Sequence, residues 1–521
     1  MASIAPVNSA MATLAPLALK ATGTATRPLA LTLPLALCII AVATILLRLG
    51  TLWTEQVDWD EWSFILMGAD VAHGHLPFVH QFDLKPPLVF FLFGATIALF
   101  GKSLVAIRLL GALCVFVAAS FVFLTGRRIA GAWPALAGAL LTVALASASF
   151  GLSTSSELPA IAFLAAATWR LTRWPLNARD AAVTGLLVTL AVMTRTNLAL
   201  VAVVIGVLLL VATLLSRDGM SRRAWLAYGL AGLVPPIVLV LAYAAHGELA
   251  TLKLAMIDVP LAYSGQLGVV AVARQHAIQS YYTALASPFL FGPSALLVLA
   301  GGAFGIAALF RRTASKRFWW LIVLFTMTGA VAGSLLIGGA AYPHYWLQLM
   351  PFAGLFATFG IASLAHLASK MRAGLAAIIA LPIASGLVAS LPNLPASYTG
   401  AHPARQAADY IHATGGTHPT VWALHKHLVL WYLDAPELSR AGVHPDNLAR
   451  RAIIDTLAAH GYVGHDEVGR LMAMRPQFLV TDASGKGLAW VRKDGKPIDD
   501  WLATHYYRDA QFGDVLVYRR R

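Results

Sequence analysis

Charged residues and cysteines are scarce in this sequence. Only 12% of its 521 residues are charged and 58% are apolar, whereas an average soluble domain has about 25% charged residues. This composition excludes a water-soluble enzyme, a disordered protein and a secreted disulfide scaffold. The two cysteines, Cys38 and Cys114, lie in apolar runs and are too few for a disulfide framework or a thiolate metal site. A membrane protein with several spanning helices remains.

Two sequence motifs are also absent. No spacing of His or Cys resembles a zinc site, and no glycine-rich loop that could cradle a phosphate is present. The second absence argues against a nucleotide as the direct donor or energy source. We therefore predict that no cofactor is required. A divalent cation is allowed, although the acidic residues offer no clear ligand spacing.

The net charge of +14 is distributed unevenly along the chain. Of the 38 Lys and Arg residues, 15 follow residue 400, and most of the others form short clusters between apolar runs. Such clusters are typical of cytoplasmic loops under the positive-inside rule and not of a nucleic-acid surface. The expected partners are therefore membrane lipids, with no nucleic acid.

The apolar runs predict about eleven transmembrane helices, each long enough or nearly long enough for ~30 Å of hydrocarbon. An odd number places the two chain ends on opposite sides of the membrane, and every basic cluster between spans then falls on the cytoplasmic side. Residues 1–27 form the predicted cytoplasmic tail of a multi-pass protein. The predicted spans are 28–50, 104–126, 130–151, 157–171, 179–194, 196–216, 223–245, 285–310, 318–338, 345–367 and 373–391.

Two external loops and a C-terminal domain complete the predicted organisation, outside a membrane domain over 28–391. The loop 51–103 contains an apolar stretch, 86–100, that would reach only about 22 Å as a helix and should lie at the outer interface. A second loop covers 246–284. Residues 392–521 carry 13 of the 24 acidic residues, and their short mixed segments predict a small periplasmic α/β domain. ARQAADYIHATG and DNLARRAIIDTLAAHG read as helices, and PTVWAL, QFLVTDA and DVLVYRR as strands.

Acidic residues gather in the first external loop. Asp60 and Glu61 begin a helical pattern among aromatic residues such as Trp62. Aromatic neighbours reduce solvation and can raise the pKa of a carboxylate toward that of a general base. We therefore predict that this pair is catalytic. The other loop acids, such as Glu55 and Asp70, are more simply explained as solvated.

Two basic residues are candidates for binding a phosphate. Lys85 precedes two prolines that can open a helix at the membrane surface, although a snorkelling lysine would look the same. Arg195, in VMTRTN, interrupts two apolar runs near the external side. An ionisable residue at this depth is a functional candidate, and a guanidinium suits a phosphate diester.

Three more candidates lie at the outer ends of predicted spans. Glu157 follows GLSTSS, where an acid at a helix start is also favoured by the helix dipole. Tyr342 and His344 belong to YPHYWLQLMP, which is in part an ordinary aromatic belt. His344 could bind phosphate, ligate a metal or form a hydrogen bond.

Residues 57–113, VDWDEWSFILMGADVAHGHLPFVHQFDLKPPLVFFLFGATIALFGKSLVAIRLLGAL, resemble the first external loop of glycosyltransferase family 39. This family of membrane enzymes has the GT-C fold and includes protein O-mannosyltransferases and bacterial lipid A aminoarabinose transferases. The resemblance continues in GLSTSSELP, VMTRTN and YPHYWLQLMP, and weakly in VWALHKHLVLWYLDAPELSR. It implies a polytopic all-α GT-C domain followed by the α/β domain.

The resemblance also assigns residues. The family's loop acid matches Asp60, the basic residue before the proline pair matches Lys85, and the acid after the third span matches Glu157. The basic residue of the VMTR-like element matches Arg195. Some members carry an acid directly before the lysine; here Leu84 takes that place, and Asp83, one residue earlier, is a substrate-binding candidate.

The function that the resemblance implies is an inverting transfer of a hexosyl or pentosyl unit from a polyprenyl-phosphate donor. Asp60 would take the proton of an acceptor hydroxyl, with Lys85, Arg195, His344 and Tyr342 around the donor phosphate. The acceptor could be lipid A, another glycan, a glycolipid or a protein. The alternative is a transporter or flippase of lipid-linked sugars. The gathering of charged candidates at one face and the absence of a repeat favour the enzyme.

Overall fold

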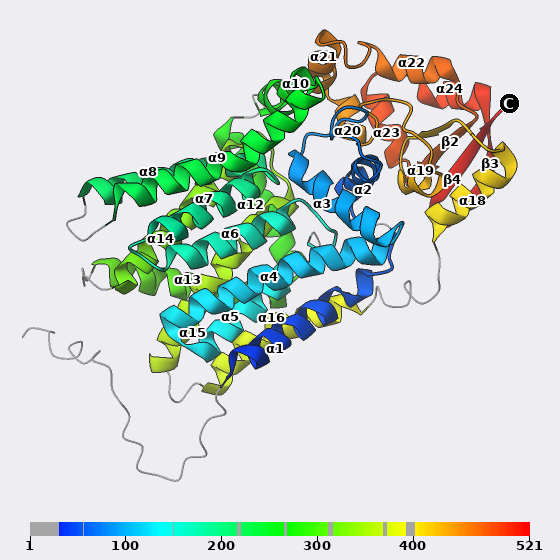
Figure 1. Cartoon of the computed structure of the whole chain (residues 1–521). Coiled ribbons are helices and arrows are strands. Elements are labelled where there is room, and N and C mark those ends of the chain that lie inside the picture. Colours follow the sequence, from blue (N-terminus) through cyan, green and yellow to red (C-terminus); the bar gives the residue numbers. More distant parts are fainter. Residues whose placement is uncertain are drawn as a thin grey trace, which may run out of the picture.

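The computed structural model describes most of the chain as a helical bundle with a small mixed domain at one end (Figure 1). The described residues are 31–55, 57–148, 151–215, 220–264, 268–310, 316–367, 372–391 and 402–521. The predicted tail 1–27 and the residues just after the predicted domain boundary at 391 lie outside these ranges.

A helix is present at each of the eleven predicted spans. They are α1 Leu33–Arg48, α4 Leu104–Ala130, α5 Ala132–Ala146, α6 Glu157–Leu171, α7 Ala178–Val192, α8 Ala199–Leu215, α9 Arg222–Ala245, α13 Pro288–Phe310, α14 Lys316–Ile337, α15 Met350–Leu367 and α16 Arg372–Ser390. In the described part of the chain, seven helices are long and apolar enough to cross a membrane, or eight if one bent pair is a single span. The protein is therefore a multi-pass membrane protein, and the number of eleven crossings stays a prediction. The helices α5, α6 and α7 have 15 residues each, about 22 Å at ~1.5 Å per residue.

Small residues let the bundle helices approach closely. A Cβ on Gly138 of α5 would lie 2.4 Å from the carbonyl oxygen of Gly354 on α15, and a Cβ on Gly185 of α7 would lie 2.1 Å from that of Tyr228 on α9. Contacts this tight leave no room for any side chain. In a membrane, where burial of apolar surface gives helices little reason to associate, such close packing is a main source of stability.

The predicted first external loop folds into two packed helices, α2 Trp59–Ala72 and α3 Pro87–Phe100. The Asp58 side chain caps α2 by accepting a hydrogen bond from the Asp60 amide at 3.2 Å. The proline at the start of α3 is tolerated because a first-turn amide has no partner within the helix. At 14 residues, α3 is too short to span a membrane, in agreement with the length predicted from its apolar run.

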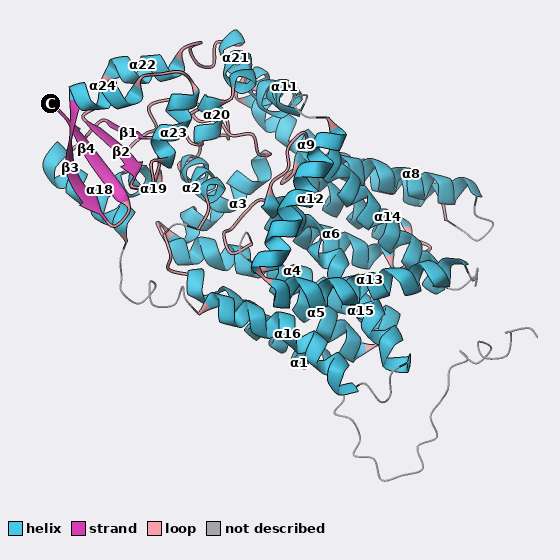
Figure 2. Cartoon of the chain, turned by 180° about the vertical axis from the view of Figure 1, so that it is seen from behind, coloured by secondary structure: helices cyan, strands magenta, loops and turns pink. Residues whose placement is uncertain are grey.

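The second external loop is also helical. It contains α10 Leu249–Lys253, a π-helical turn Leu254–Asp258, α11 Val259–Ser264 and α12 Val269–Ala286. The segments 249–264 and 269–286 are bent by 85° relative to each other. The first of them lies beside the end of α9 and contacts the C-terminal domain through α11 and α21 (Figure 2).

The C-terminal domain combines helices with one sheet of four strands in the order β1-β2-β4-β3 (Figure 2). The strands β1 and β2 are parallel, and the other two pairs are antiparallel. The α/β character predicted for these residues is therefore confirmed, although β3 was not predicted. The elements are α18 Pro403–Gly415, β1 Val421–Ala423, α19 Leu428–Leu433, α20 Pro445–Ala449, α21 Arg451–Ala459, α22 Glu467–Met474, β2 Phe478–Asp482, α23 Lys486–Lys493, α24 Ile498–His505, β3 Tyr506–Phe512 and β4 Val515–Arg520.

The C-terminal domain packs on α2, and the two share one hydrophobic core. The Ser63 hydroxyl donates to the Val443 carbonyl at 2.8 Å, and the ring of His425 lies edge-on to Trp62 at 5.2 Å. The Glu55 carboxylate accepts hydrogen bonds from the first amides of α18 at 2.8 and 3.2 Å. Glu55 is thus buried at a helix N-terminus, where burial raises the pKa of its carboxyl even though the two amides lower it, and its interpretation as a solvated loop acid is wrong.

Candidate active site

A cavity of about 950 Å³ lies between the first external loop, the helix bundle and the C-terminal domain. One end is polar and contains most of the residues predicted from the sequence. The other end is apolar. The polar lining consists of Asp58, Asp60, Asp83, Lys85, Arg195, Tyr342, His344, Tyr345, His444, Asp446 and Arg450, among others.

Asp60 lies at the centre of the polar end, in the first turn of α2. Its Oδ2 forms an ion pair of 2.9 Å with Lys85 Nζ, and its Oδ1 is 3.1 Å from His444 Nε2. Since His444 Nδ1 accepts the Asp446 amide at 3.2 Å, the proton of the neutral ring is on Nε2 and is donated to Asp60. Three elements distant in sequence therefore meet at one carboxylate.

These partners decide the charge of Asp60. Burial alone would raise the pKa of its carboxyl, but the ammonium of Lys85 and the hydrogen bond from His444 outweigh burial and hold this pKa well below its usual range. For Lys85, the charges of Asp60 and Asp83 overcome the effect of burial and raise its pKa. Both groups are thus charged at neutral pH. We expected aromatic neighbours to raise the pKa of Asp60, and this does not hold while Asp60 is paired with Lys85.

A second ion pair lies beside the first. Arg195 precedes the 3₁₀ turn Thr196–Leu198, and its Nη1 is 3.1 Å from Oε1 of Glu157 at the start of α6. His344, in the 3₁₀ turn Pro343–Leu349, lies between the two pairs: its Nε2 is 3.9 Å from Asp60 Oδ2 and 3.8 Å from Glu157 Oε1. Tyr342 stacks on the His344 ring at 5.6 Å. The structure thus brings these five predicted residues together.

Glu61 does not reach the cavity. It is fully buried on another side of α2, where its Oε2 forms an ion pair of 2.6 Å with Arg108 and its Oε1 accepts the Thr154 amide at 2.6 Å. Successive residues on a helix point about 100° apart, so Glu61 cannot share the environment of Asp60. The prediction that Glu61 is catalytic therefore finds no support in its position, which is that of a residue anchoring α2 to the bundle.

Asp83 does line the cavity. Its Oδ1 accepts the Lys85 amide at 3.1 Å, and burial raises the pKa of its carboxyl despite the nearby Lys85 ammonium. It thereby fixes the backbone that presents Lys85 to Asp60. Its neighbour Asp58 also lines the cavity, with a pKa raised to about 6 by burial and by the charge of Asp60.

The residues that the C-terminal domain contributes to the cavity were not predicted from the sequence. His444 and Asp446 flank Pro445 at the start of α20, and Arg450 lies between α20 and α21. The Arg450 guanidinium donates to the Tyr342 hydroxyl and, at 3.0 Å, to Asp446 Oδ2. The predicted continuous helix DNLARRAIIDTLAAHG breaks at Arg450, which is why this side chain can face the cavity. A weak sequence signal is His444-Pro445 directly before the predicted helix, which itself begins with the polar pair Asp446 and Asn447.

The apolar part of the cavity lining includes side chains that are also exposed on the outside of the protein. It is formed by side chains of α8, α11 and α14, including Val203, Leu261 and Ile337. These three side chains are 60 to 67% exposed in the protein alone. Large apolar side chains exposed on helices of a multi-pass protein are covered by lipid chains. The cavity therefore joins a charged pocket to a surface that suits lipid.

The acids of the cavity do not form a metal site in the part of the chain that the structure describes. The one group there with three ligand atoms close together is Asp70, His75 and His80, none of which lines the cavity. Of the cavity acids, Asp60 is paired with Lys85 and Asp446 with Arg450.

This architecture is similar to that of known membrane glycosyltransferases. Residues 84–243 match the family model of dolichyl-phosphate-mannose-protein mannosyltransferase. The fold is similar to that of ArnT from Cupriavidus metallidurans bound to undecaprenyl phosphate, with a TM-score of 0.62 and 16% identity over 94% of this chain and 98% of that one. The family model covers less than a third of the chain, and the likeness to ArnT shows a shared fold. The resemblance found in the sequence is thereby confirmed.

A more distant GT-C structure shares the same architecture. The archaeal oligosaccharyltransferase AglB from Archaeoglobus fulgidus, in complex with an inhibitory peptide and a dolichol phosphate, is similar with a TM-score of 0.52 and 12% identity, over 94% of this chain and 74% of that one. No curated protein sequence matches this chain. At these identities the structural likenesses show the fold, and function has to be argued from the site.

Proposed function

We propose that this protein is an inverting membrane glycosyltransferase that moves a sugar from a polyprenyl-phosphate donor to an acceptor hydroxyl at the periplasmic face of the bacterial inner membrane. The observation that carries this proposal is the continuity of the cavity. Its charged end and its lipid-facing end fit the two halves of such a donor, an anionic phosphosugar and an apolar chain.

The donor phosphate would bind between Lys85 and Arg195. Both side chains line the cavity and are at most 16% exposed. A guanidinium and an ammonium in a site of low dielectric stabilise phosphate charge far more than they would in water. The polyprenyl chain of the bound donor would extend from the cavity along α8, α11 and α14. Tyr342 and His344 border the same region and would contact the phosphate or the sugar.

The chemical step would use Asp60 as the base. Its carboxylate takes the proton of the acceptor hydroxyl while the acceptor oxygen forms a bond to the anomeric carbon. The bond between this carbon and the phosphate oxygen breaks, its electron pair goes to the phosphate, and attack from the opposite face inverts the anomeric centre. Lys85 and Arg195 stabilise the charge of the leaving polyprenyl phosphate.

Donor binding would also activate the base. In the structure Lys85 is paired with Asp60 at 2.9 Å, which makes Asp60 a weak base. A donor phosphate competes for the same ammonium. Once Lys85 turns toward the phosphate, Asp60 loses its main stabilising charge and its pKa rises. The base would thus become competent when the donor is in place.

The acceptor would enter from the side of the C-terminal domain. His444, Asp446 and Arg450 line the cavity there, and Arg450 lies 5.0 Å over the ring of Tyr263 from the second external loop. A pocket with a cation, a carboxylate and aromatic rings suits a polar acceptor such as a glycan, lipid A, a glycolipid or a protein side chain.

Turnover of a radiolabelled polyprenyl-phosphate sugar tests this proposal. Purified protein in proteoliposomes is given the donor together with membrane and envelope acceptors. We expect label to enter an acceptor and polyprenyl phosphate to be released. Intact donor that crosses the vesicle membrane without turnover would contradict the proposal and identify a flippase. Lys85→Ala should abolish most turnover, whereas Lys102→Ala, which removes an exposed lysine paired with Asp434, should not.

A further inference from the structure

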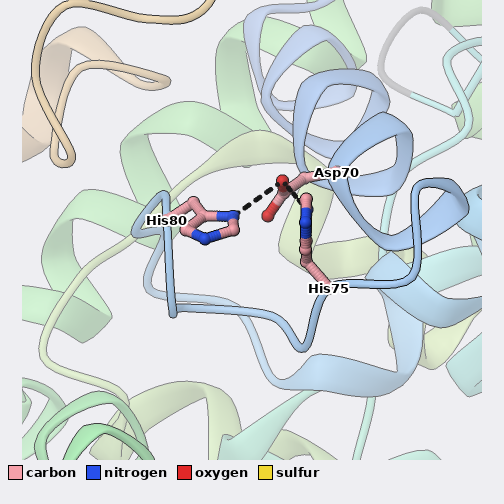
Figure 3. A group of neighbouring side chains, drawn as sticks. All are labelled: Asp70, His75 and His80. Carbon is pink, nitrogen blue, oxygen red and sulfur yellow. Dashed lines mark hydrogen bonds and ion pairs between the residues drawn. The ribbon is translucent and has the colours of Figure 1, made fainter.

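Three metal-ligand side chains meet outside the cavity, at the far end of α2. Asp70 lies in the last turn of this helix, and His75 and His80 follow in the loop 73–82. Figure 3 shows both imidazole rings directed at the Asp70 carboxylate. His75 Nδ1 is 2.7 Å and His80 Nδ1 is 3.1 Å from the same oxygen, Asp70 Oδ1.

The side chains of this group lie close enough together to bind one small cation. The three ligand atoms all lie within 4.8 Å of one another. The two rings are nearly perpendicular, at 81° with centroids 4.2 Å apart. Two imidazole nitrogens and a carboxylate oxygen form a donor set that Zn²⁺ accepts at about 2.0–2.2 Å. Both histidines are about half exposed, so water can complete the coordination.

The loop is held in shape by contacts that do not involve the two histidines. Gly74, with φ of +93°, makes the turn after α2, a conformation that favours glycine. The Tyr243 hydroxyl donates to the Pro77 carbonyl at 2.5 Å, and the Tyr462 hydroxyl donates to the Phe78 carbonyl. Arg440 donates to the Val79 carbonyl. The backbone on which His75 and His80 lie is thus positioned in advance, which lowers the entropic cost of binding an ion.

We propose that Asp70, His75 and His80 bind one divalent transition-metal ion of the zinc type, as a structural site separate from the catalytic cavity. Asp70 is ten residues from Asp60 along α2, about 15 Å at ~1.5 Å per residue. The ion ties the loop 73–82 to the end of α2. This loop leads directly into Asp83 and Lys85, so the metal steadies the segment that carries the phosphate-binding lysine.

Metal binding itself provides the test. Protein purified with a cleavable tag is stripped with chelator, dialysed against Zn²⁺ and analysed for zinc by mass spectrometry. We expect one Zn²⁺ per chain. His75→Ala and His80→Ala should each weaken binding by at least about tenfold, because even partners outside the coordination shell contribute that much. His73→Ala is the matched control, since this exposed neighbour is not part of the group.

Two readouts keep the test independent of folding and of activity. Co²⁺ bound to the wild-type chain should show the visible absorption of a site with nitrogen and oxygen ligands. Zn²⁺ should raise the thermal unfolding midpoint of wild type and His73→Ala, but not that of His75→Ala. Binding of less than one Zn²⁺ by wild type, or equal binding by His75→Ala, His80→Ala and wild type, would overturn the proposal. A wild-type protein that binds one Zn²⁺ but transfers no sugar would refute only the function proposed above.

Discussion

Replacement of His444 by alanine probes the link between the C-terminal domain and Asp60, the proposed catalytic carboxylate. The His444 ring donates to Asp60 Oδ1 at 3.1 Å, and this bond is among the causes that hold the pKa of Asp60 below its usual range. A hydrogen bond to a charged group is worth about 1.5–3 kcal/mol. At ~1.36 kcal/mol per unit, its loss should raise the pKa of Asp60 by roughly one to two units.

The sign of the effect on catalysis follows from the role of Asp60. The carboxylate has to be ionised to accept a proton, so activity is retained above its pKa and falls as the pH drops through it. The acid limb of kcat/KM reports the free enzyme. For the wild type this limb should lie below the ordinary Asp value of ~3.9, and His444→Ala should move it upward by one to two pH units.

The assay is donor turnover after brief exposure to each pH, with a return to neutral pH to confirm that the protein has not unfolded. His412→Ala is the matched control, because His412 is an exposed histidine of the same domain that does not line the cavity. An acid limb that does not move in His444→Ala would refute the claim that this residue tunes Asp60. A movement of equal size in His412→Ala would refute it as well.

Three other variants or fusions test separate parts of the account. Arg195→Ala should weaken use of the donor by roughly ten- to a hundredfold, which is the value of a charge-assisted hydrogen bond at ~1.4 kcal/mol per decade. Arg195→Lys should retain part of the activity that Arg195→Ala loses. A normal donor KM and kcat in Arg195→Ala would exclude a phosphate contact. Glu61→Gln should lower thermal stability, because breaking a buried pair such as that with Arg108 costs about 3–5 kcal/mol; an unchanged unfolding midpoint would contradict the anchoring role. A reporter fused after Arg128 should read cytoplasmic and one fused after Arg521 periplasmic, and a cytoplasmic result at Arg521 would contradict the proposed orientation.

The helices of the bundle could be predicted because each depends on a local property, an apolar run. The same holds for α3, whose run is too short to span. Strand β3 was missed because its sequence, YYRDAQF, lacks a regular apolar alternation and depends on pairing with β4. The break at Arg450 was missed because the apolar period continues across it, so the pattern carries no sign of the interruption.

The candidate site was predictable where one segment carries both the residue and its context. Asp60 and Lys85 belong to one loop, and the two are only 25 positions apart. His444 is 384 positions from Asp60, and nothing local to either residue predicts that they meet. The prediction for Glu61 finds no support for a different reason. Its neighbour in sequence is catalytic by prediction, but the helical rotation of about 100° per residue directs it to Arg108 instead.

The central claim, that Asp60 is the base at the head of a lipid-phosphate cavity, is tested most directly by Asp60→Asn. Sugar transfer from a radiolabelled polyprenyl-phosphate donor is measured together with donor binding on the same preparation. Asparagine keeps the shape of the side chain but cannot accept the proton, so transfer should fall by about 10²–10⁴-fold. Donor binding should be retained, because in the proposed site Lys85 and Arg195 make the phosphate contacts. Transfer at the wild-type rate by Asp60→Asn would contradict the account.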